Sequence, residues 1–259
     1  MHGDIMTGNN KNFAVELTEK EIERYDRQIM IKGWGVEGQK KLKKSRVVVV
    51  GAGGLGSPTA IYLAVAGVGE LILVDSDVVE LNNLNRQILH WDQDIGLPKV
   101  KSAKEKLEKM NPHVKVKIVQ EEVTKDNVIS IIKGAHVVVD ALDNFKTRYI
   151  LNEACVKLDI PLVHAGVYGF TGQLTTIVPK KGPCLKCIFP RPPMEKEKFP
   201  VVGVTPGIIG SMEALEAIKF ITGIGVPLVG RLLIFDGEDF TVEVVKIERD
   251  EGCPICGEK

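Results

Sequence analysis

The chain has 259 residues, enough to bury one sizeable core, and its 34 Lys and Arg residues balance its 34 Asp and Glu residues. This neutral charge argues against a nucleic acid or an anionic membrane as the partner, so any charge that binds phosphate must be local. The sequence has neither a signal peptide at its start nor a run of roughly 20 apolar residues. We therefore expect a soluble, cytoplasmic protein without membrane spans.

The first part of the chain predicts a tail followed by a helix. The opening residues are polar and aperiodic, so residues 1–16 are expected to form a flexible tail. Thr18 and Glu21 have the spacing of a capping box, which predicts the start of a helix. One face of this predicted helix carries the apolar residues Ile22, Tyr25, Ile29 and Met30.

Strands and helices then alternate along the chain. The strands are continuous apolar runs, which are typical of a parallel sheet covered on both faces. The alternation predicts an α/β fold with a right-handed, doubly wound, Rossmann-like sheet. The predicted strands are 46–50, 70–74, 114–119, 136–140 and 161–165, and the predicted helices are 55–66, 99–110, 126–133 and 145–158.

The pattern changes after Gly166. The segment FTGQLTTIVP reads as a strand, and RLLIFDGEDFTVEVVKIE reads as a hairpin that turns around Asp236 and Gly237. Between them, a helical period runs from 209 to 221 and is stopped by Gly223. We therefore predict a single domain, 17–259, whose mainly parallel sheet ends in antiparallel strands.

A glycine cluster follows the first predicted strand. Gly51, Gly53 and Gly56 fit G-x-G-x-x-G between a strand and a helix, where backbone N–H groups can approach phosphate. Gly54 allows still closer approach, and Asp75 ends the next strand, where a carboxylate can hold ribose hydroxyls. The pattern indicates a ribonucleotide but does not separate NAD, FAD, S-adenosylmethionine and ATP. A tight turn without a ligand is the alternative.

Cations beyond Asp75 favour ATP over a redox cofactor. Asn82, Asn85 and Arg86 lie together, and Lys99 follows at a predicted helix start. A nicotinamide site needs one cation at most, whereas a triphosphate suits a planar Arg together with a compact Lys charge. Each of these side chains taken alone could be a solvated surface charge.

Two acidic residues flank the carboxyl end of the strand 136–140. Asp140 and Asp143 lie where α/β sheets bind ligands. Asp143 could be only the N-cap of the following helix, or it could bind Mg²⁺, which prefers carboxylate and phosphate oxygens. No His-Asp or Tyr-x-x-x-Lys set of a dehydrogenase fits the sequence.

Four of the five cysteines form two Cys-x-x-Cys pairs. Four thiolates are the number that a closed structural zinc site requires, here joining 184–187 to 253–256. Free thiols or a redox pair are the alternatives. The fifth, Cys155, lies on a predicted amphipathic helix and is expected to be a buried thiol. The four candidate zinc ligands are Cys184, Cys187, Cys253 and Cys256.

These motifs together resemble the ThiF/MoeB adenylyltransferases, relatives of the ubiquitin-activating enzymes. The resemblance rests on RYDRQIMIKGWGVEGQKKL, GAGGLGS, DSDVVELNNLNRQ, GLPK, DALDN and the two cysteine pairs, and it spans about 17–256. It implies that ATP and Mg²⁺ adenylate the C-terminal glycine of a ubiquitin-fold sulfur carrier of the MoaD or ThiS type, which ends in Gly-Gly. The products would be an acyl-adenylate and pyrophosphate for molybdopterin- or thiamine-type sulfur transfer.

The resemblance also implies roles for individual residues. Gly54 would lie at the nucleotide, Asp75 would hold the ribose, and Asp143 with Asn144 would bind magnesium and nucleotide. Arg27 would reach the ATP of the other subunit of an obligate homodimer. A crossover loop, about 188–204, would grip the carrier's tail. The implied phosphate ligands are Asn82, Asn85, Arg86 and Lys99, and the implied catalytic set is Arg27, Arg86, Lys99 and Asp143.

One position departs from the family pattern. Many members carry a further cysteine in the crossover loop, but the aligned stretch Met194 to Lys198 has none. We therefore expect the reaction to stop at adenylation, with sulfur coming from a separate donor. Activation of another carboxylate, such as one on a modified tRNA adenosine, and a non-catalytic nucleotide-binding dimeric scaffold remain as alternatives.

Overall fold

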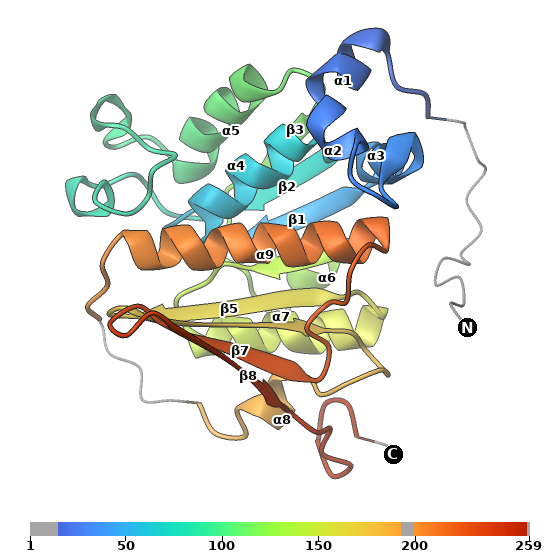
Figure 1. The fold of residues 1–259 in the computed structure, drawn as a ribbon. Coiled ribbons are helices and arrows are strands. Elements are labelled where there is room, and N and C mark those ends of the chain that lie inside the picture. Colours follow the sequence, from blue (N-terminus) through green and yellow to red (C-terminus); the bar gives the residue numbers. More distant parts are fainter. Residues whose placement is uncertain (1–14, 193–198, 258–259) are drawn as a thin grey trace.

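The valine run before the glycine cluster forms the buried centre of a sheet. In the computed structural model, which describes residues 15–192 and 199–257, eight strands follow the order β3-β2-β1-β4-β5-β6-β7-β8 (Figure 1). Pairing is parallel from β3 to β5 and antiparallel from β5 to β8, which confirms the predicted α/β fold. The strands are β1 (Arg46–Val50), β2 (Glu70–Val74), β3 (Lys115–Val119), β4 (Val137–Asp140), β5 (Leu162–Tyr168), β6 (Thr171–Ile177), β7 (Arg231–Asp236) and β8 (Thr241–Lys246).

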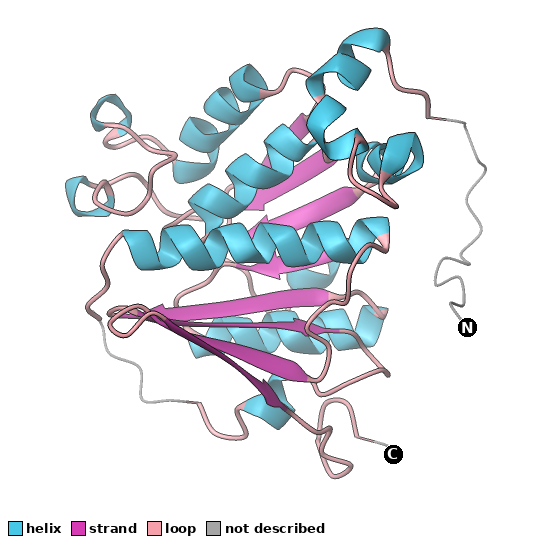
Figure 2. Ribbon diagram, viewed as in Figure 1, coloured by secondary structure: helices cyan, strands magenta, loops and turns pink. Residues whose placement is uncertain are grey.

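Helices cover both faces of the parallel part of the sheet. One core packs β1 and its neighbours against α3, α4, α5 and α9, and a second core packs the other face against α6, α7 and α8 (Figure 2). Both faces of the central strands are thus buried, as their continuous apolar runs predict. The helices are α1 (Glu19–Arg24), α2 (Asp26–Ile29), α3 (Gly35–Lys44), α4 (Gly56–Ala66), α5 (Lys99–Met110), α6 (Val128–Ile132), α7 (Phe145–Leu158), α8 (Leu185–Ile188) and α9 (Val204–Thr222), with 3₁₀ turns η1 (Leu81–Asn83) and η2 (Asp92–Asp94).

The order of the strands fixes where a ligand can bind. The chain leaves β1 for β2 on one side, while β4 pairs with β1 on the other. Ligands of open α/β sheets bind at such a switch point, outside the carboxyl ends of the strands. The glycine cluster follows β1, and the predicted acidic residues follow β2 and β4, so the fold gathers these segments at one edge.

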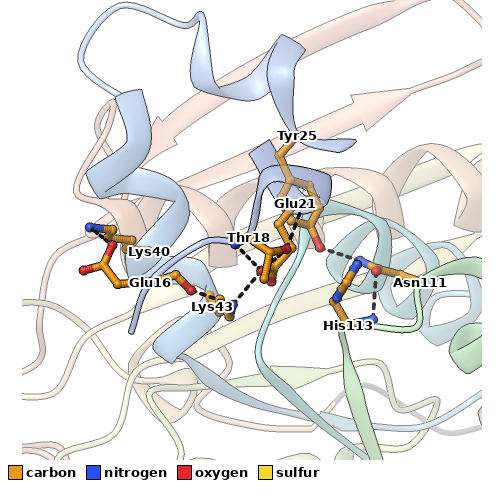
Figure 3. A network of polar contacts seen from close by, with 8 residues as sticks. All are labelled: Glu16, Thr18, Glu21, Tyr25, Lys40, Lys43, Asn111 and His113. Carbon is orange, nitrogen blue, oxygen red and sulfur yellow. Dashed lines mark hydrogen bonds and ion pairs between the residues drawn. The ribbon is translucent and has the colours of Figure 1, made fainter. Parts of the chain in front are cut away.

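The N-terminal segment is anchored by polar contacts. Thr18 Oγ1 accepts a hydrogen bond from the Glu21 N–H at 3.3 Å, which confirms the capping box. The buried Glu21 carboxylate also lies 2.7 Å from Lys43 Nζ on α3 (Figure 3). Glu16, expected to lie in the flexible tail, lies 2.8 Å from Lys40 Nζ. Residues 1–14 lie outside the described part of the chain.

The single N-terminal helix that the sequence predicts is instead two short helices, so that prediction was wrong. α1 ends at Arg24 and α2 begins at Asp26. Tyr25, at the junction, is buried, and its hydroxyl accepts a hydrogen bond from Asn111 Nδ2 at 2.8 Å (Figure 3). Of the predicted apolar face, only Tyr25 is buried within the chain. The break lies at Tyr25, whose φ of −101° and ψ of 12° are outside the α-helical region.

The long helix α9 extends the predicted helix toward its N-terminus. It begins at Val204 rather than near 209, and it ends at Gly223, whose left-handed φ of 77° confirms the predicted stop. Among the described residues, no helix is long and apolar enough to cross a membrane.

Candidate active site

A cleft of about 1470 Å³ opens at the carboxyl ends of β1, β2, β4 and β5. It gathers segments that lie far apart in the sequence. Nearly all the predicted nucleotide-binding residues line this cleft, and Gly56 and Arg27 are the two that do not. The predicted residues that line it are Gly51, Gly53, Gly54, Asp75, Asn82, Asn85, Arg86, Lys99, Asp143 and Asn144.

The glycines of the loop serve two different purposes. Gly51 has a φ of 103°, and a Cβ there would lie 2.4 Å from the Ala141 carbonyl oxygen. A Cβ on Gly56 would lie 1.9 Å from the Gly51 carbonyl oxygen, so Gly56 is required by backbone packing. Gly53 and Gly54 line the cleft, as Gly51 also does. α4 begins here without a side-chain cap, as is common where a helix N-terminus faces phosphate.

Asp75 is held rigidly at the end of β2. Its Oδ2 accepts a hydrogen bond from the Ala52 N–H at 2.7 Å, and its Oδ1 accepts one from the Asp77 N–H at 2.8 Å. Burial raises the pKa of Asp75, and the positive charge of Lys99 opposes that rise. The carboxylate is therefore oriented by the backbone toward the cleft that it lines.

The ammonium of Lys99 lies at the start of α5 and is nearly buried. Its Nζ lies 2.8 Å from Asp77 Oδ2, an ion pair that the sequence analysis did not identify. Asp77 also lines the cleft and is largely exposed. A phosphate oxygen could therefore take the place of this carboxylate without uncovering new surface.

Arg86 is presented by the turn that follows η1. Its Nη1 donates to the Asn82 carbonyl oxygen at 2.8 Å and to Asn85 Oδ1 at 3.1 Å. These contacts hold the guanidinium at the cleft wall, and within 15–192 and 199–257 its other N–H groups have no hydrogen-bond partner. The motif N-N-L-N-R thus contains residues that position the arginine, and these same residues are candidate phosphate ligands.

Asp143 and Asn144, in the loop between β4 and α7, take the two roles that the sequence left open, that of helix cap and that of candidate magnesium ligand. Asn144 is the N-cap of α7, because its Oδ1 accepts a hydrogen bond from the Thr147 N–H at 2.9 Å. Asp143 is therefore not the cap, and its exposed carboxylate lines the cleft. An exposed carboxylate that lines the cleft fits a magnesium ligand.

Asp140 does not line the cleft, although it flanks the same strand end. It is fully buried, and its Oδ2 accepts a hydrogen bond from His164 Nδ1 at 2.6 Å. Burial lowers the pKa of His164, although the neighbouring Asp140 carboxylate raises it. Asp140 is followed directly by Ala141 and Leu142, which do line the cleft.

Arg148 is a site residue that the sequence analysis missed. It is 5% exposed and lines the cleft, and its guanidinium donates to the carbonyl oxygens of Leu142 and Ala165. It thereby ties the segment that carries Asp143 to β5. Its spacing, four residues after Asn144, was the available signal, since one helical turn carries the side chain back toward the helix start.

Arg27 lies away from the cleft on α2, exposed to solvent. Its neighbour Gln28 donates to Gln39 Oε1 at 2.9 Å and to the Ala66 carbonyl oxygen at 3.1 Å. The segment is therefore fixed, and it points Arg27 outward. Within one chain, Arg27 does not contribute to the cleft.

The four paired cysteines meet as predicted. Their sulfur atoms all lie within 4.8 Å of one another, and the Cys184–Cys253 and Cys187–Cys256 pairs are 3.7 Å and 3.4 Å apart. A tetrahedral zinc with Zn–S bonds of about 2.3 Å places its sulfurs about 3.8 Å apart, so this donor set fits zinc. Cys155 is buried, as predicted, and burial raises its pKa.

The chain matches known proteins over most of its length. The sequence model of the ThiF family matches residues 25–255. The SAMP-activating enzyme E1 of Haloferax volcanii is 48% identical over 251 residues, covering 95% of this chain and 92% of that protein. The sulfur carrier protein adenylyltransferase of Thermus thermophilus is 42% identical over 252 residues, covering 93% of each.

The chain also matches a longer relative and a solved structure. Adenylyltransferase and sulfurtransferase MOCS3 of Culex quinquefasciatus is 44% identical over 254 residues, which are 96% of this chain and 58% of that protein. The crystal structure of E. coli MccB with ATP has a TM-score of 0.81 at 26% identity and covers 93% of this chain and 76% of that one. These matches confirm the resemblance seen in the motifs, and the chain belongs to the ThiF family.

Proposed function

We propose that this protein uses ATP to adenylate the C-terminal glycine of a ubiquitin-like sulfur carrier. The observation that carries the proposal is the cleft, where Asp75, Arg86, Lys99 and Asp143 surround a glycine loop at the switch point of the sheet. An acid for ribose, two cations and an acid for magnesium are the groups that ATP requires. The adenylating relatives of similar length support the same activity.

The reaction forms one bond to phosphorus and breaks another. A carboxylate oxygen of the terminal glycine attacks the α-phosphorus of ATP, and pyrophosphate leaves with the electrons of the broken P–O bond. Arg86 and Lys99 stabilise the negative charge that moves onto the phosphate oxygens. Asp143 would hold a magnesium ion, which would supply further charge neutralisation. The products are the acyl-adenylate and pyrophosphate.

The far end of the cleft suits an extended peptide tail. Beyond the nucleotide region it is lined by residues of β5, β6 and β7 and by both sides of the crossover loop. Tyr168 and Phe199 stack there with ring centroids 6.4 Å apart. The loop's central residues, 193–198, which include the aligned position between Met194 and Lys198, lie outside the described part of the chain. The residues at this end are Gly166, Val167, Tyr168, Thr171, Gln173, Phe189, Phe199, Pro200, Val201 and Ile234.

Sulfur would come from a separate donor. Four of the chain's five cysteines lie in the zinc-like cluster, and Cys155 is fully buried on α7. A buried thiol whose pKa is raised is a poor nucleophile for thioester chemistry. The acyl-adenylate would therefore pass to a sulfur donor outside this chain.

ATP–pyrophosphate exchange tests the activity directly. We expect purified protein with ATP and Mg²⁺ to exchange labelled pyrophosphate into ATP only when a ubiquitin-fold protein ending in Gly-Gly is present. The matched control is the same carrier without its last glycine, which should support no exchange because the attacking carboxylate is displaced. The proposal is wrong if no Gly-Gly carrier supports exchange.

A homodimer would place Arg27 in the cleft of the partner. A hollow of about 830 Å³ between α9 and the segment after η1 is lined by apolar side chains, and Val204, Leu215 and Ile88 there are 66%, 55% and 56% exposed. Contiguous exposed apolar surface of this kind marks protein interfaces. Met30, close to Arg27 in the sequence, is 67% exposed as well.

Mixing two inactive variants distinguishes action in trans from action in cis. Arg27→Ala and Arg86→Ala chains should each be inactive as homodimers. In a mixed dimer, one site regains both arginines and the other has neither, so random mixing should restore about a quarter of the wild-type exchange rate. If Arg27 acted within its own chain, mixing would restore nothing. Light scattering on each pure variant provides the control for dimer formation.

A further inference from the structure

A buried histidine outside the predicted site joins the segments that carry the phosphate-facing groups. His90 is 3% exposed and does not line the cleft. Its Nε2 lies 2.9 Å from the carbonyl oxygen of Ala52 in the glycine loop. Its Nδ1 lies 2.8 Å from Ser102 Oγ, one helical turn after Lys99 on α5. One ring therefore contacts both the loop and the helix.

The partners of His90 determine where its hydrogen lies. A carbonyl oxygen can only accept, so Nε2 carries the hydrogen and donates it to Ala52. Nδ1 of the neutral ring is then an acceptor that faces the Ser102 hydroxyl, whose single hydrogen is also within reach of Asp94 Oδ2 at 2.9 Å. Burial lowers the pKa of His90, and the charges of Lys106 and Lys99 lower it further, whereas the Ala52 carbonyl and Asp94 raise it. The ring is thus a fixed donor at one end and a fixed acceptor at the other.

The support behind His90 is itself anchored. Lys106 Nζ lies 2.5 Å from Asp94 Oδ2 and 2.9 Å from Ser102 Oγ. The Trp91 N–H donates to the same Asp94 oxygen at 2.8 Å. Both charged side chains are less than a tenth exposed. A buried ion pair offers little net stability, so its value here is that it fixes the geometry around Ser102.

Ala52 connects His90 to the residues that line the cleft. His90 binds the Ala52 carbonyl, while Asp75 Oδ2 accepts the Ala52 N–H at 2.7 Å. Both polar groups of this residue are therefore held, and Gly53 and Gly54 follow it into the cleft. The backbone N–H of His90 donates to the Gln87 carbonyl oxygen at 2.9 Å, in the turns that also carry Arg86.

We propose that His90 is a positioning residue for ATP. It holds the glycine loop in register with the turn of Arg86 and the helix of Lys99, and it touches no substrate atom. The inference rests on the proposed function, which supplies ATP as the ligand. Loss of the His90–Ala52 hydrogen bond should leave these three phosphate-facing groups less well aligned.

Two substitutions at His90 test this role by direct ATP binding and by exchange. His90→Leu keeps the side-chain volume but cannot donate to Ala52, and we expect the Kd for ATP to rise about tenfold and the exchange kcat to fall about tenfold or more. The KM for the carrier should not change. His90→Gln restores a donor, so its ATP Kd and kcat should stay within about threefold of wild type.

Controls separate positioning from folding and from the proposed function. His113→Leu removes an exposed histidine after α5 and should change neither the ATP Kd nor the exchange kcat. If His90→Leu does not fold by circular dichroism, Ser102→Ala decides. It removes the hydroxyl beside Nδ1, together with that hydroxyl's contacts to Asp94 and Lys106, and should raise the ATP Kd about threefold. An unchanged Kd in that variant overturns the inference.

Further outcomes contradict the role of His90 alone. A folded His90→Leu protein with wild-type ATP Kd and kcat overturns it, and so does a folded His90→Gln protein as impaired as His90→Leu. If the wild-type protein itself bound no ATP in calorimetry, the proposed function would fail first. The two failures are therefore distinguishable in one set of titrations.

Discussion

Arg86→Ala is expected to lower the rate of ATP–pyrophosphate exchange by about 10²- to 10³-fold while the protein stays folded. The Arg86 guanidinium lines the cleft and presents N–H groups in a planar fork, and loss of such a donor removes stabilisation gained mainly in the transition state. Its side-chain contacts are with Asn82 and Asn85 on the exposed side of the turn. The free energy of unfolding should therefore change by no more than about 0.5 kcal/mol.

Two further variants sharpen the Arg86 experiment. Arg86→Lys keeps the charge but loses the fork, so its exchange rate should lie between those of Arg86→Ala and wild type. Lys104→Ala removes an exposed cation of α5 that pairs with Glu108, and its exchange rate should match wild type. Near-normal exchange by a folded Arg86→Ala protein would contradict the assigned role.

The parallel part of the sheet could be predicted from the sequence almost residue by residue. β1 and β2 have the predicted bounds because apolar runs of four or more residues leave no alternative to burial on both faces. α7 also has the predicted bounds, since Asn144 caps its start and the chain turns left-handed at Asp159. The bounds of these elements could be predicted because local sequence patterns, apolar runs and helix caps, determine them.

Elements whose bounds depend on tertiary packing were predicted less well. α3 begins in a glycine-containing stretch and was not predicted, and α9 extends back through Pro206 because its first turns pack beside the glycine loop. Gly54 shows that packing, since a Cβ there would lie 3.3 Å from Pro206. Local propensity disfavours helix at these positions, and the tertiary contacts override it.

The site residues also divide into those that local sequence predicts and those that depend on tertiary contacts. The glycine loop and Asp75 follow a strand directly, so their meeting at one edge could be predicted. The partnerships of Lys99 with Asp77 and of His90 with Ala52 join residues 22 and 38 positions apart, and no local pattern reports them. Asp140 looked equivalent to Asp143 in sequence, but it belongs to the strand and its side chain points into the core.

Loss of the four-cysteine cluster should have the largest effect on stability. The cluster holds the end of the chain against α8, and Cys184, Leu185, Cys253 and Cys256 all belong to the core on the α7 face. α8 is tied to α7 through the Leu185 N–H, which donates to Asn152 Oδ1 at 2.9 Å. A bound zinc would therefore join the C-terminus, α8 and the sheet.

Cys253→Ser should remove zinc and lower the melting temperature by roughly 10 °C. Loss of a structural metal costs about 4 kcal/mol or more, and each kcal/mol shifts the midpoint by about 2–4 °C in a chain of this size. Exchange should fall as well, because Phe189, which follows α8 directly, lines the cleft. Metal analysis should find about one zinc per wild-type chain and far less in the variant.

Cys155→Ala separates the metal from the mere loss of a buried thiol. Cys155 is as buried as Cys184 but lies on α7 outside the cluster, so its variant should keep about one zinc per chain and lose much less stability than Cys253→Ser. A chelator should then destabilise wild type and Cys155→Ala alike and leave Cys253→Ser unchanged. Equal zinc content and equal stability in wild type and Cys253→Ser would contradict a structural four-thiolate zinc site, because losing one of the four thiolates opens its closed shell.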